Sequence, residues 1–251
     1  MTESAWPTIG LDQLQPCLNI EPGRIDLWSI PLGPVDRTID TLADFISDDE
    51  WARANRFVYA DHRRRYVVAH AGLRLLLSRY TGVAAGVLDF EFGQQGKPSL
   101  AAPRAEIAFN LSHSAELAVV AVASPVRLGV DVEQLREVTD ATAIARSFFS
   151  AAEAVALAAV APTDRDRAFL TCWTRKEAFV KALGGGLSVD LTGFAVNLSR
   201  ERPAFLTIED PAMATVPWSI IHLEPEAGYL GATVIQSATC SATFRCLDLG
   251  S

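Results

Sequence analysis

The sequence has no long apolar run and no signal-like start. Its longest apolar stretches, such as LAVVAVA from Leu117, fall far short of the roughly 18 residues that a membrane-spanning helix needs. The N-terminal stretch MTESAWPTIG has neither a basic start nor an apolar core, so it is not typical of a secretory signal. We therefore expect a cytoplasmic protein with no membrane partner.

Cysteine is scarce and basic charge is not in excess. The chain has 4 cysteines and no CxxC pair, so we expect free thiols, although Cys240 and Cys246 are close enough in sequence to pair. The net charge is −8, which argues against nucleic acid as a partner because domains that bind it are usually basic. A local basic pocket for a phosphorylated small molecule is compatible with this charge.

Several common catalytic signatures are absent. The sequence contains no GxxxxGKS/T loop, no GxGxxG after a strand and no GxSxG elbow. These absences argue against a hydrolase triad and against a Mg²⁺-dependent enzyme that binds a nucleotide pyrophosphate through one of these loops.

The residues that are present predict a mixed fold. Apolar residues make up 49% of the 251 positions, enough to fill a core. The first half predicts a strand, a helix and a long helix, at residues 24–30, 48–57 and about 62–80. Ser47 with Glu50 is a capping box for the first helix, and Gly82 ends the second. A strand at LDFEF from Leu88 and a turn at GQQGKP follow.

Each half shows the order strand, helices, long helix ending at a glycine, then strands. The strand patterns EIAFNLSH and ELAVVAVA end the first half, and VRLGVDVE begins the second. A helical region at 139–184, interrupted by Pro162, follows. Ser150 with Glu153 is another capping box. Further strands are expected near Phe194, Phe205, Trp218 and Tyr229. We predict an α+β fold of two similar halves, residues 1–124 and 125–251.

The stretch CWTRKEAFVKALGGGL, residues 172–187, is an apolar helix that carries Lys176, Glu177 and Lys181 within six positions and stops at three glycines. At about 100° per residue, its core stripe is formed by Phe169, Trp173, Val180 and Leu183. Glu177 and Lys181 lie four residues apart on one border of the stripe, as a surface pair or as part of a site. Lys176 lies at the edge of the stripe, where its aliphatic stem can pack.

The stretch GVDVEQ, residues 129–134, places two carboxylates on one strand face. Asp131 and Glu133 point to one side, about 7 Å apart, and the valines point to the other. These carboxylates form either an exposed strand face or a site for a cation, and all-oxygen ligands suit Mg²⁺. Glu177 would complete such a set.

Two weaker patterns carry possible phosphate donors. FNLSHS at 109–114 ends a strand with Ser112 and His113, although a histidine at a strand end is more often a structural hydrogen-bonding group. GKP at 96–98 is, taken alone, a lysine in a turn.

Together these motifs resemble a known family. GKP, FNLSHS, GVDVE, FFSxxE at 148–153 and WTRKEAFVKALGGGL, in this order, resemble the 4′-phosphopantetheinyl transferases of the surfactin-synthetase type over residues 46–187. The resemblance implies a pseudo-dimer of two α/β halves with the active site in the cleft between them. It also implies transfer of the phosphopantetheine arm of coenzyme A to a serine of an apo carrier protein, with release of adenosine 3′,5′-bisphosphate.

The resemblance assigns roles to residues of this chain. Asp131, Glu133 and Glu177 would hold Mg²⁺, or Mn²⁺ in its place, and Lys181 would stabilise the pyrophosphate and the leaving group. Lys176 would be an electrostatic helper. Ser112 and His113 would bind phosphates. The adenine would be bordered by Gly96, Lys97 and Pro98. The final glycines of the helix would let the carrier or the pantetheine arm approach the backbone.

The 3′-phosphate ligands and the general base are less determined by the resemblance. Arg53 and Arg65 take the family's basic positions, whereas Glu50 departs from the pattern, so that Arg56, Arg63 or Arg64 would substitute. Glu177, Glu153 and a metal-bound hydroxide are three candidates for the base.

The carriers served, whether of fatty-acid, polyketide or peptide synthesis, do not follow from the sequence. We expect a monomer that docks acidic carriers through a mainly apolar patch assisted by the arginines at 63–65. A catalytically silent module that binds coenzyme A or carriers is the alternative, which the intact carboxylates disfavour.

Overall fold

The computed structural model describes residues 6–34, 39–102 and 106–250. Their contacts divide the chain into two compact units. The N-terminal unit comprises the described residues of 6–92, 98–125 and 241–250. The C-terminal unit comprises residues 93–97 and 126–240. Both units combine helices with mostly antiparallel sheets, so the predicted α+β class is confirmed.

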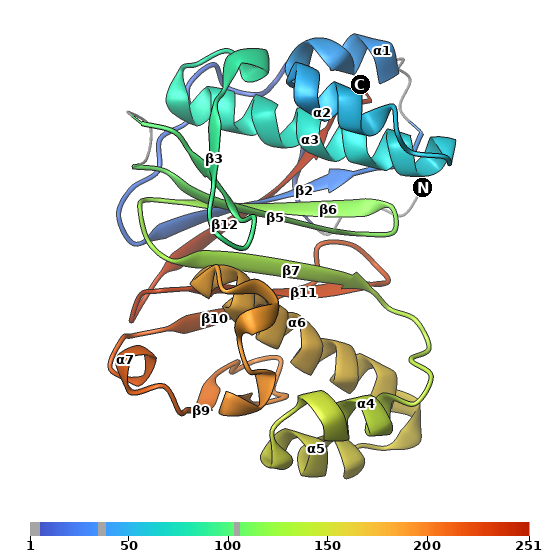
Figure 1. Ribbon diagram of the computed structural model, residues 1–251, viewed down its shortest axis with the longest axis vertical. Coiled ribbons are helices and arrows are strands. Elements are labelled where there is room, and N and C mark those ends of the chain that lie inside the picture. The colour runs from blue at the N-terminus through green and yellow to red at the C-terminus, as the bar shows by residue number, and fades with distance from the viewer. Residues whose placement is uncertain (1–5, 35–38, 103–105, 251) are drawn as a thin grey trace. The chain divides into compact units, whose positions relative to one another are not determined.

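The N-terminal unit contains a five-stranded sheet with helices on one face (Figure 1). The strands, in spatial order, are β1 (Thr8–Gly10), β12 (Ser241–Asp248), β2 (Arg24–Pro31), β6 (Leu117–Ala123) and β5 (Ala108–Ser114). Strand β12 runs parallel to both of its neighbours, and β6 runs antiparallel to β2 and β5. The unit also contains a hairpin and three α-helices: β3 (Phe90–Phe92), β4 (Pro98–Leu100), α1 (Ile39–Leu42), α2 (Asp48–Ala54) and α3 (Ala60–Thr81).

Local signals in the sequence explain the two longer helices of this unit. The hydroxyl of Ser47 accepts from the amide of Glu50, whose carboxylate accepts from the amide of Ser47, which is the predicted capping box of α2. Helix α2 ends at Ala54, earlier than predicted, because the amides of Arg56 and Phe57 bond three residues back, as in a tight turn. Helix α3 ends at Gly82, whose φ of 72° is favoured by glycine.

The C-terminal unit has a three-stranded antiparallel sheet on which its longest helix packs (Figure 1). The sheet consists of β10 (Ser219–Leu223), β11 (Tyr229–Ile235) and β7 (Leu128–Gln134), in that order. The predicted helical region forms three helices, α4 (Ala141–Phe148), α5 (Ala151–Ala158) and α6 (Arg165–Leu183). A second hairpin and a short helix complete the unit: β8 (Phe194–Val196), β9 (Phe205–Ile208) and α7 (Pro211–Ala214).

Helix α6 approaches β7 closely because of one glycine. A Cβ atom at Gly129 would lie 2.1 Å from the carbonyl oxygen of Ala178, so only glycine fits there. The predicted core stripe of the helix is largely confirmed, since Phe169 and Val180 are buried, while Trp173 and Leu183 are half-buried. This packing fixes α6 against the strand that carries the GVDVE motif.

The sequence patterns predict neither β1 nor β12. Strand β12 comes from the last residues of the chain yet pairs with β2 in the N-terminal unit. Its partner lies more than 200 positions away, and a local apolar pattern does not specify such a partner.

Candidate active site

The two carboxylates of the GVDVE motif lie on the face of β7 that α6 covers. The ammonium of Lys181, on α6, is 2.7 Å from Oδ1 of Asp131. Glu133 follows two residues later and therefore points to the same side. Asp131 is buried and Glu133 is half-buried. The strand that carries GVDVE and the helix that carries Lys181 are thus joined by a direct contact.

Glu177 belongs electrostatically to this group of carboxylates. Burial raises the pKa of its carboxyl, the negative charges of Asp131 and Glu133 raise it further, and Lys181 lowers it. Three carboxylates that repel one another inside one unit favour a cation among them. Their oxygen-only donor set fits Mg²⁺ or Mn²⁺.

The carboxylates are not arranged as a finished ligand set. Across the described ranges, no three His, Cys, Asp or Glu side chains are placed to hold one ion. In this arrangement one oxygen of Asp131 is bound to the ammonium of Lys181. Metal ligation by Asp131, Glu133 and Glu177 therefore stays a prediction, supported by their proximity and donor type.

Glu153 and Lys176 form a buried ion pair. The ammonium of Lys176 lies 2.9 and 2.8 Å from the two oxygens of Glu153 and 2.7 Å from the carbonyl oxygen of Phe194. The amides of Ser150 and Val196 also donate to the Glu153 carboxylate. Neither side chain has any exposed surface. A base must come within hydrogen-bond distance of the proton that it accepts, so this burial disfavours Glu153 as the base and Lys176 as a contact to substrate.

Lys97 of the GKP motif lies in the C-terminal unit. Its ammonium donates to the carbonyl oxygens of Leu128 and Lys181, both at 2.7 Å. Burial, with a smaller contribution from the charge of Arg127, lowers its pKa to about 8. Gly96 has a φ of 78°, and Pro98 begins β4. The side chain of Lys97 thus binds protein main chain.

The basic residues predicted for the 3′-phosphate lie on or beside α2 and α3. Arg53 is exposed and its guanidinium lies 5.5 Å from the ring centroid of Tyr66. Arg65 donates from Nε to a carboxylate oxygen of Glu116 at 2.9 Å, and Arg64 binds the same carboxylate. Arg53 is therefore the more accessible of the two predicted ligands.

Glu50, where the family pattern has a basic residue, has a structural role. Its carboxylate is 2.8 Å from His70 Nδ1 and 2.5 Å from Arg74 Nε. Burial opposes its ionisation, but the hydrogen bonds from His70 and Ser47 and the nearby positive charges outweigh burial and lower the pKa to about 2. The departure thus replaces a basic side chain with a carboxylate that binds α3.

Ser112 and His113 occupy adjacent positions of β5, in the N-terminal unit. Ser112 is buried and His113 is exposed, as expected for neighbouring residues of one strand. Their roles as phosphate ligands stay predictions.

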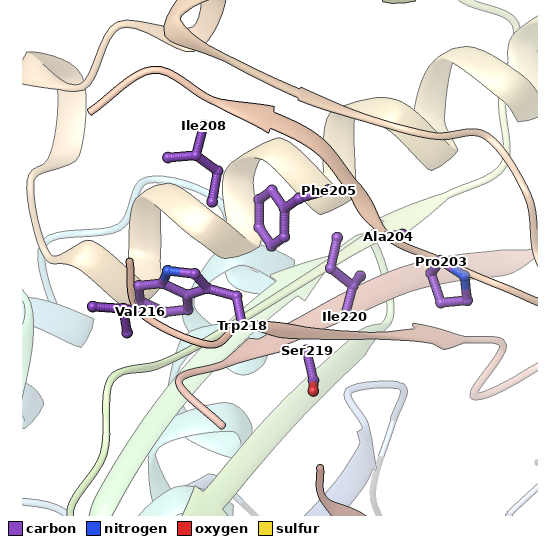
Figure 2. A pocket seen from close by; sticks show the side chains of 8 residues that line it. All are labelled: Pro203, Ala204, Phe205, Ile208, Val216, Trp218, Ser219 and Ile220. Atoms are coloured by element: carbon purple, nitrogen blue, oxygen red, sulfur yellow. The ribbon is translucent and has the colours of Figure 1, made fainter. Parts of the chain in front are cut away.

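A groove in the C-terminal unit contains none of the predicted site residues. It measures about 340 Å³ and lies beside β9 and β10 (Figure 2). Its lining is formed by Pro203, Ala204, Phe205, Ile208, Val216, Trp218, Ser219 and Ile220. The indole of Trp218 donates to the carbonyl oxygen of Met213, so this polar group is already satisfied.

Two further expectations concern thiols and membranes. The cysteines at positions 17, 172, 240 and 246 are free thiols. Among the residues that the structure describes, no helix combines the length and the apolar character required to cross a membrane.

Comparison with known proteins identifies the family. A model described as the 4′-phosphopantetheinyl transferase superfamily matches residues 127–234, and one described as 4′-phosphopantetheinyl transferase, N-terminal, matches residues 32–125. The chain is 35% identical over 223 residues to the 4′-phosphopantetheinyl transferase HetI of Nostoc sp.. This alignment covers 88% of this chain and 91% of that relative.

Two relatives from bacilli align over much of the chain as well. The 4′-phosphopantetheinyl transferase psf-1 of Bacillus pumilus is 32% identical over 73% of this chain and 79% of its own length. The transferase Sfp of Bacillus subtilis is 28% identical over 81% of this chain and 85% of its own length. The chain therefore belongs to the 4′-phosphopantetheinyl transferase family and is an enzyme of that class, as the resemblance in its motifs predicts.

Proposed function

We propose that this enzyme transfers the 4′-phosphopantetheine arm of coenzyme A to a serine of an apo acyl- or peptidyl-carrier protein, in a Mg²⁺-dependent reaction. The observation that supports this assignment most is the convergence of Glu177 with Asp131, Glu133 and Lys181 in the C-terminal unit. A divalent cation would offset the negative charge that remains on these three carboxylates beside Lys181, and the cation and Lys181 would both attract a diphosphate.

The chemistry is a phosphoryl transfer. The serine oxygen forms a bond to the β-phosphorus of coenzyme A, the bond from that phosphorus to the bridging oxygen breaks, and adenosine 3′,5′-bisphosphate leaves. Asp131, Glu133 and Glu177 would hold the metal ion. When bound, the ion would neutralise negative charge on the pyrophosphate oxygens.

Lys181 and Glu177 have complementary parts in this proposal. The side chain of Lys181 is 29% exposed, so its ammonium can turn from Asp131 to the diphosphate and donate a proton to the leaving oxygen. Glu177 is half-buried, and of the two carboxylate candidates for the base only it retains exposed surface. We assign to Glu177 the acceptance of the serine proton.

We also propose contacts to coenzyme A from residues outside the carboxylate group of the C-terminal unit. Arg53 and Arg65 would bind the 3′-phosphate, Ser112 and His113 would bind phosphates, and Gly96 and Pro98 would border the adenine. The exposed positions of Arg53 and His113 are compatible with these roles. We further propose that the enzyme acts in the cytoplasm as a monomer.

Intact-mass spectrometry of an apo carrier protein tests the transfer. The carrier is incubated with this enzyme, coenzyme A and Mg²⁺, and we expect a mass gain of one phosphopantetheine. Asp131→Ala and addition of EDTA should both abolish the gain, whereas Glu209→Gln, an exposed carboxylate of the same unit, should leave it unchanged.

Two outcomes would contradict parts of the proposal. A full mass gain in EDTA would exclude the metal requirement. No gain on carriers of fatty-acid, polyketide and peptide synthesis, together with measurable binding of coenzyme A, would favour a silent binding module instead. Quantifying adenosine 3′,5′-bisphosphate in the same reactions checks the predicted leaving group.

A further inference from the structure

The turn at residues 93–97, between β3 and β4, packs within the C-terminal unit. It is closed by a hydrogen bond of 3.0 Å from the amide of Gly93 to the carbonyl oxygen of Lys97. A Cβ atom at Gly186 would lie 3.1 Å from Cβ of Gln95, and one at Gly184 would lie 3.6 Å from Cδ of Lys97. The glycines after α6 therefore let this turn approach the end of the helix.

The two oxygens that bind the Lys97 ammonium belong to the two elements of the carboxylate group. Leu128 is the first residue of β7, three positions before Asp131. Lys181 lies in the last turn of α6, and its carbonyl oxygen also accepts from the amide of Gly184, the residue that caps the helix, at 3.2 Å. One ammonium thus joins the beginning of the strand to the end of the helix.

The local charges explain why the ammonium stays there. The negative end of the α6 dipole favours a cation at the helix C-terminus. Within the described ranges, Lys97 forms no ion pair with a carboxylate. Lys97 is half-buried, and an ammonium that has lost part of its hydration relies on its hydrogen bonds, so the two carbonyl oxygens hold the side chain in place.

The geometry points to Lys97 as a positioning residue that fixes the distance between β7 and α6, and thereby the proposed ligands Asp131 and Glu177. This inference rests on the proposed function for its catalytic consequence. It differs from the role suggested by the sequence motif, in which the lysine borders the adenine. Because its ammonium is bound to two main-chain oxygens, Lys97 would affect the reaction only by holding Lys181 and β7 in place. Its neighbours in the turn would contact the nucleotide.

The test compares Lys97→Met, which keeps the length of the side chain and removes the ammonium, with Gln94→Met, an exposed position of the same turn. Hydrogen exchange reports on the main chain at 126–134 and 178–184, Mn²⁺ titration reports on the carboxylates, and steady-state kinetics separate kcat from the KM for coenzyme A. For Lys97→Met we expect faster exchange in both segments, Mn²⁺ affinity reduced about tenfold, kcat reduced by about tenfold or more, and a KM within about twofold.

The outcomes separate this inference from the proposed function. Unchanged exchange in both segments, or a raised KM for coenzyme A with unchanged kcat, would overturn the positioning role. Wild-type enzyme that neither binds Mn²⁺ nor modifies a carrier would overturn the proposed function, and the exchange data would still decide the structural role. Lys97→Arg, which keeps a cation and its donors, should recover part of kcat. If Lys97→Met does not fold, Lys97→Gln takes its place with the same readouts.

Discussion

The ammonium of Lys176 and the carboxylate of Glu153 form an ion pair in which neither side chain is exposed. The pair joins α5 to α6, and it also binds the backbone of β8 through Phe194 and Val196. Both residues belong to the motifs that identify the family, yet their surroundings are those of a structural element. These two charged groups therefore hold α6, the helix that carries Glu177 and Lys181, against α5 and β8.

The first prediction concerns this buried pair. Lys176→Met leaves the Glu153 carboxylate buried without its cation, and we expect a loss of about 3–5 kcal/mol of unfolding free energy. Glu153→Gln should be destabilised for the same reason. The double variant Glu153→Gln, Lys176→Met should lose less than the sum of the two single variants.

Urea denaturation of the four proteins measures the coupling between the two residues. Glu209→Gln serves as a control because its side chain is exposed. A Lys176→Met protein that keeps its stability but loses transferase activity would instead favour the electrostatic role that the sequence predicts.

The second prediction concerns Glu50 and acid stability. Its pKa is lowered from 4.5 to about 2 on folding, so its stabilising contribution is complete above pH 4.5 and is lost as the pH falls toward 2. At neutral pH the contribution is at most about 3 kcal/mol. Glu50→Gln should therefore be less stable than wild type at pH 7, and the difference should shrink between pH 4.5 and pH 2.

Unfolding free energies of both proteins, measured across this pH range, check the prediction. Asp12→Asn, an exposed carboxylate of the same unit, is the matched control. A stability difference that does not change with pH would show that Glu50 acts through packing alone.

The sequence predicts those elements whose ends carry their own signals. The boxes at Ser47 and Ser150 and the glycines at positions 82 and 184 set helix ends through contacts within a few residues. The alternation in GVDVE correctly places Asp131 on the face that Lys181 contacts. Such features depend on local geometry, and one sequence is enough to recognise them.

Contacts between residues far apart in the sequence cannot be predicted from local patterns. Lys97 binds oxygens 31 and 84 positions away, and a turn motif gives no sign of either. The sequence identifies Glu153 as part of a helix cap, but the pattern does not show that the ammonium of Lys176 binds its carboxylate. The position of Lys176 at the edge of an apolar stripe was the one available signal of its burial.

The third prediction concerns the carrier. Arg64 and Arg65 are already bound to the carboxylate of Glu116, so their charges are partly compensated before an acidic carrier arrives. We expect docking through an apolar patch, and hence a carrier KM that changes by less than about threefold between 50 and 300 mM salt. Steady-state kinetics at several salt concentrations measure this change, and a steep rise in KM with salt would contradict the apolar patch.

The fourth prediction concerns Gly129, the residue of β7 on which the backbone of α6 packs. A Cβ atom at Gly129 would lie 2.1 Å from the carbonyl oxygen of Ala178 and 2.4 Å from the amide nitrogen of Ala182, both backbone atoms. Because the helix backbone cannot rotate away as a side chain can, Gly129→Ala must displace α6 or distort β7. We expect a loss of about 1–3 kcal/mol of unfolding free energy and a fall in kcat, since Glu177 and Lys181 move with the helix.

Gly33→Ala is the control for Gly129→Ala, because a Cβ atom there would meet nothing within 4 Å. Thermal unfolding and carrier-modification kinetics of both variants separate the steric effect from the general effect of replacing glycine. Equal stability and activity of the two variants would mean that α6 can move away from β7 at little cost. In that case the distance between helix and strand would not control the carboxylate group, and the role inferred for Lys97 would lose its physical basis as well.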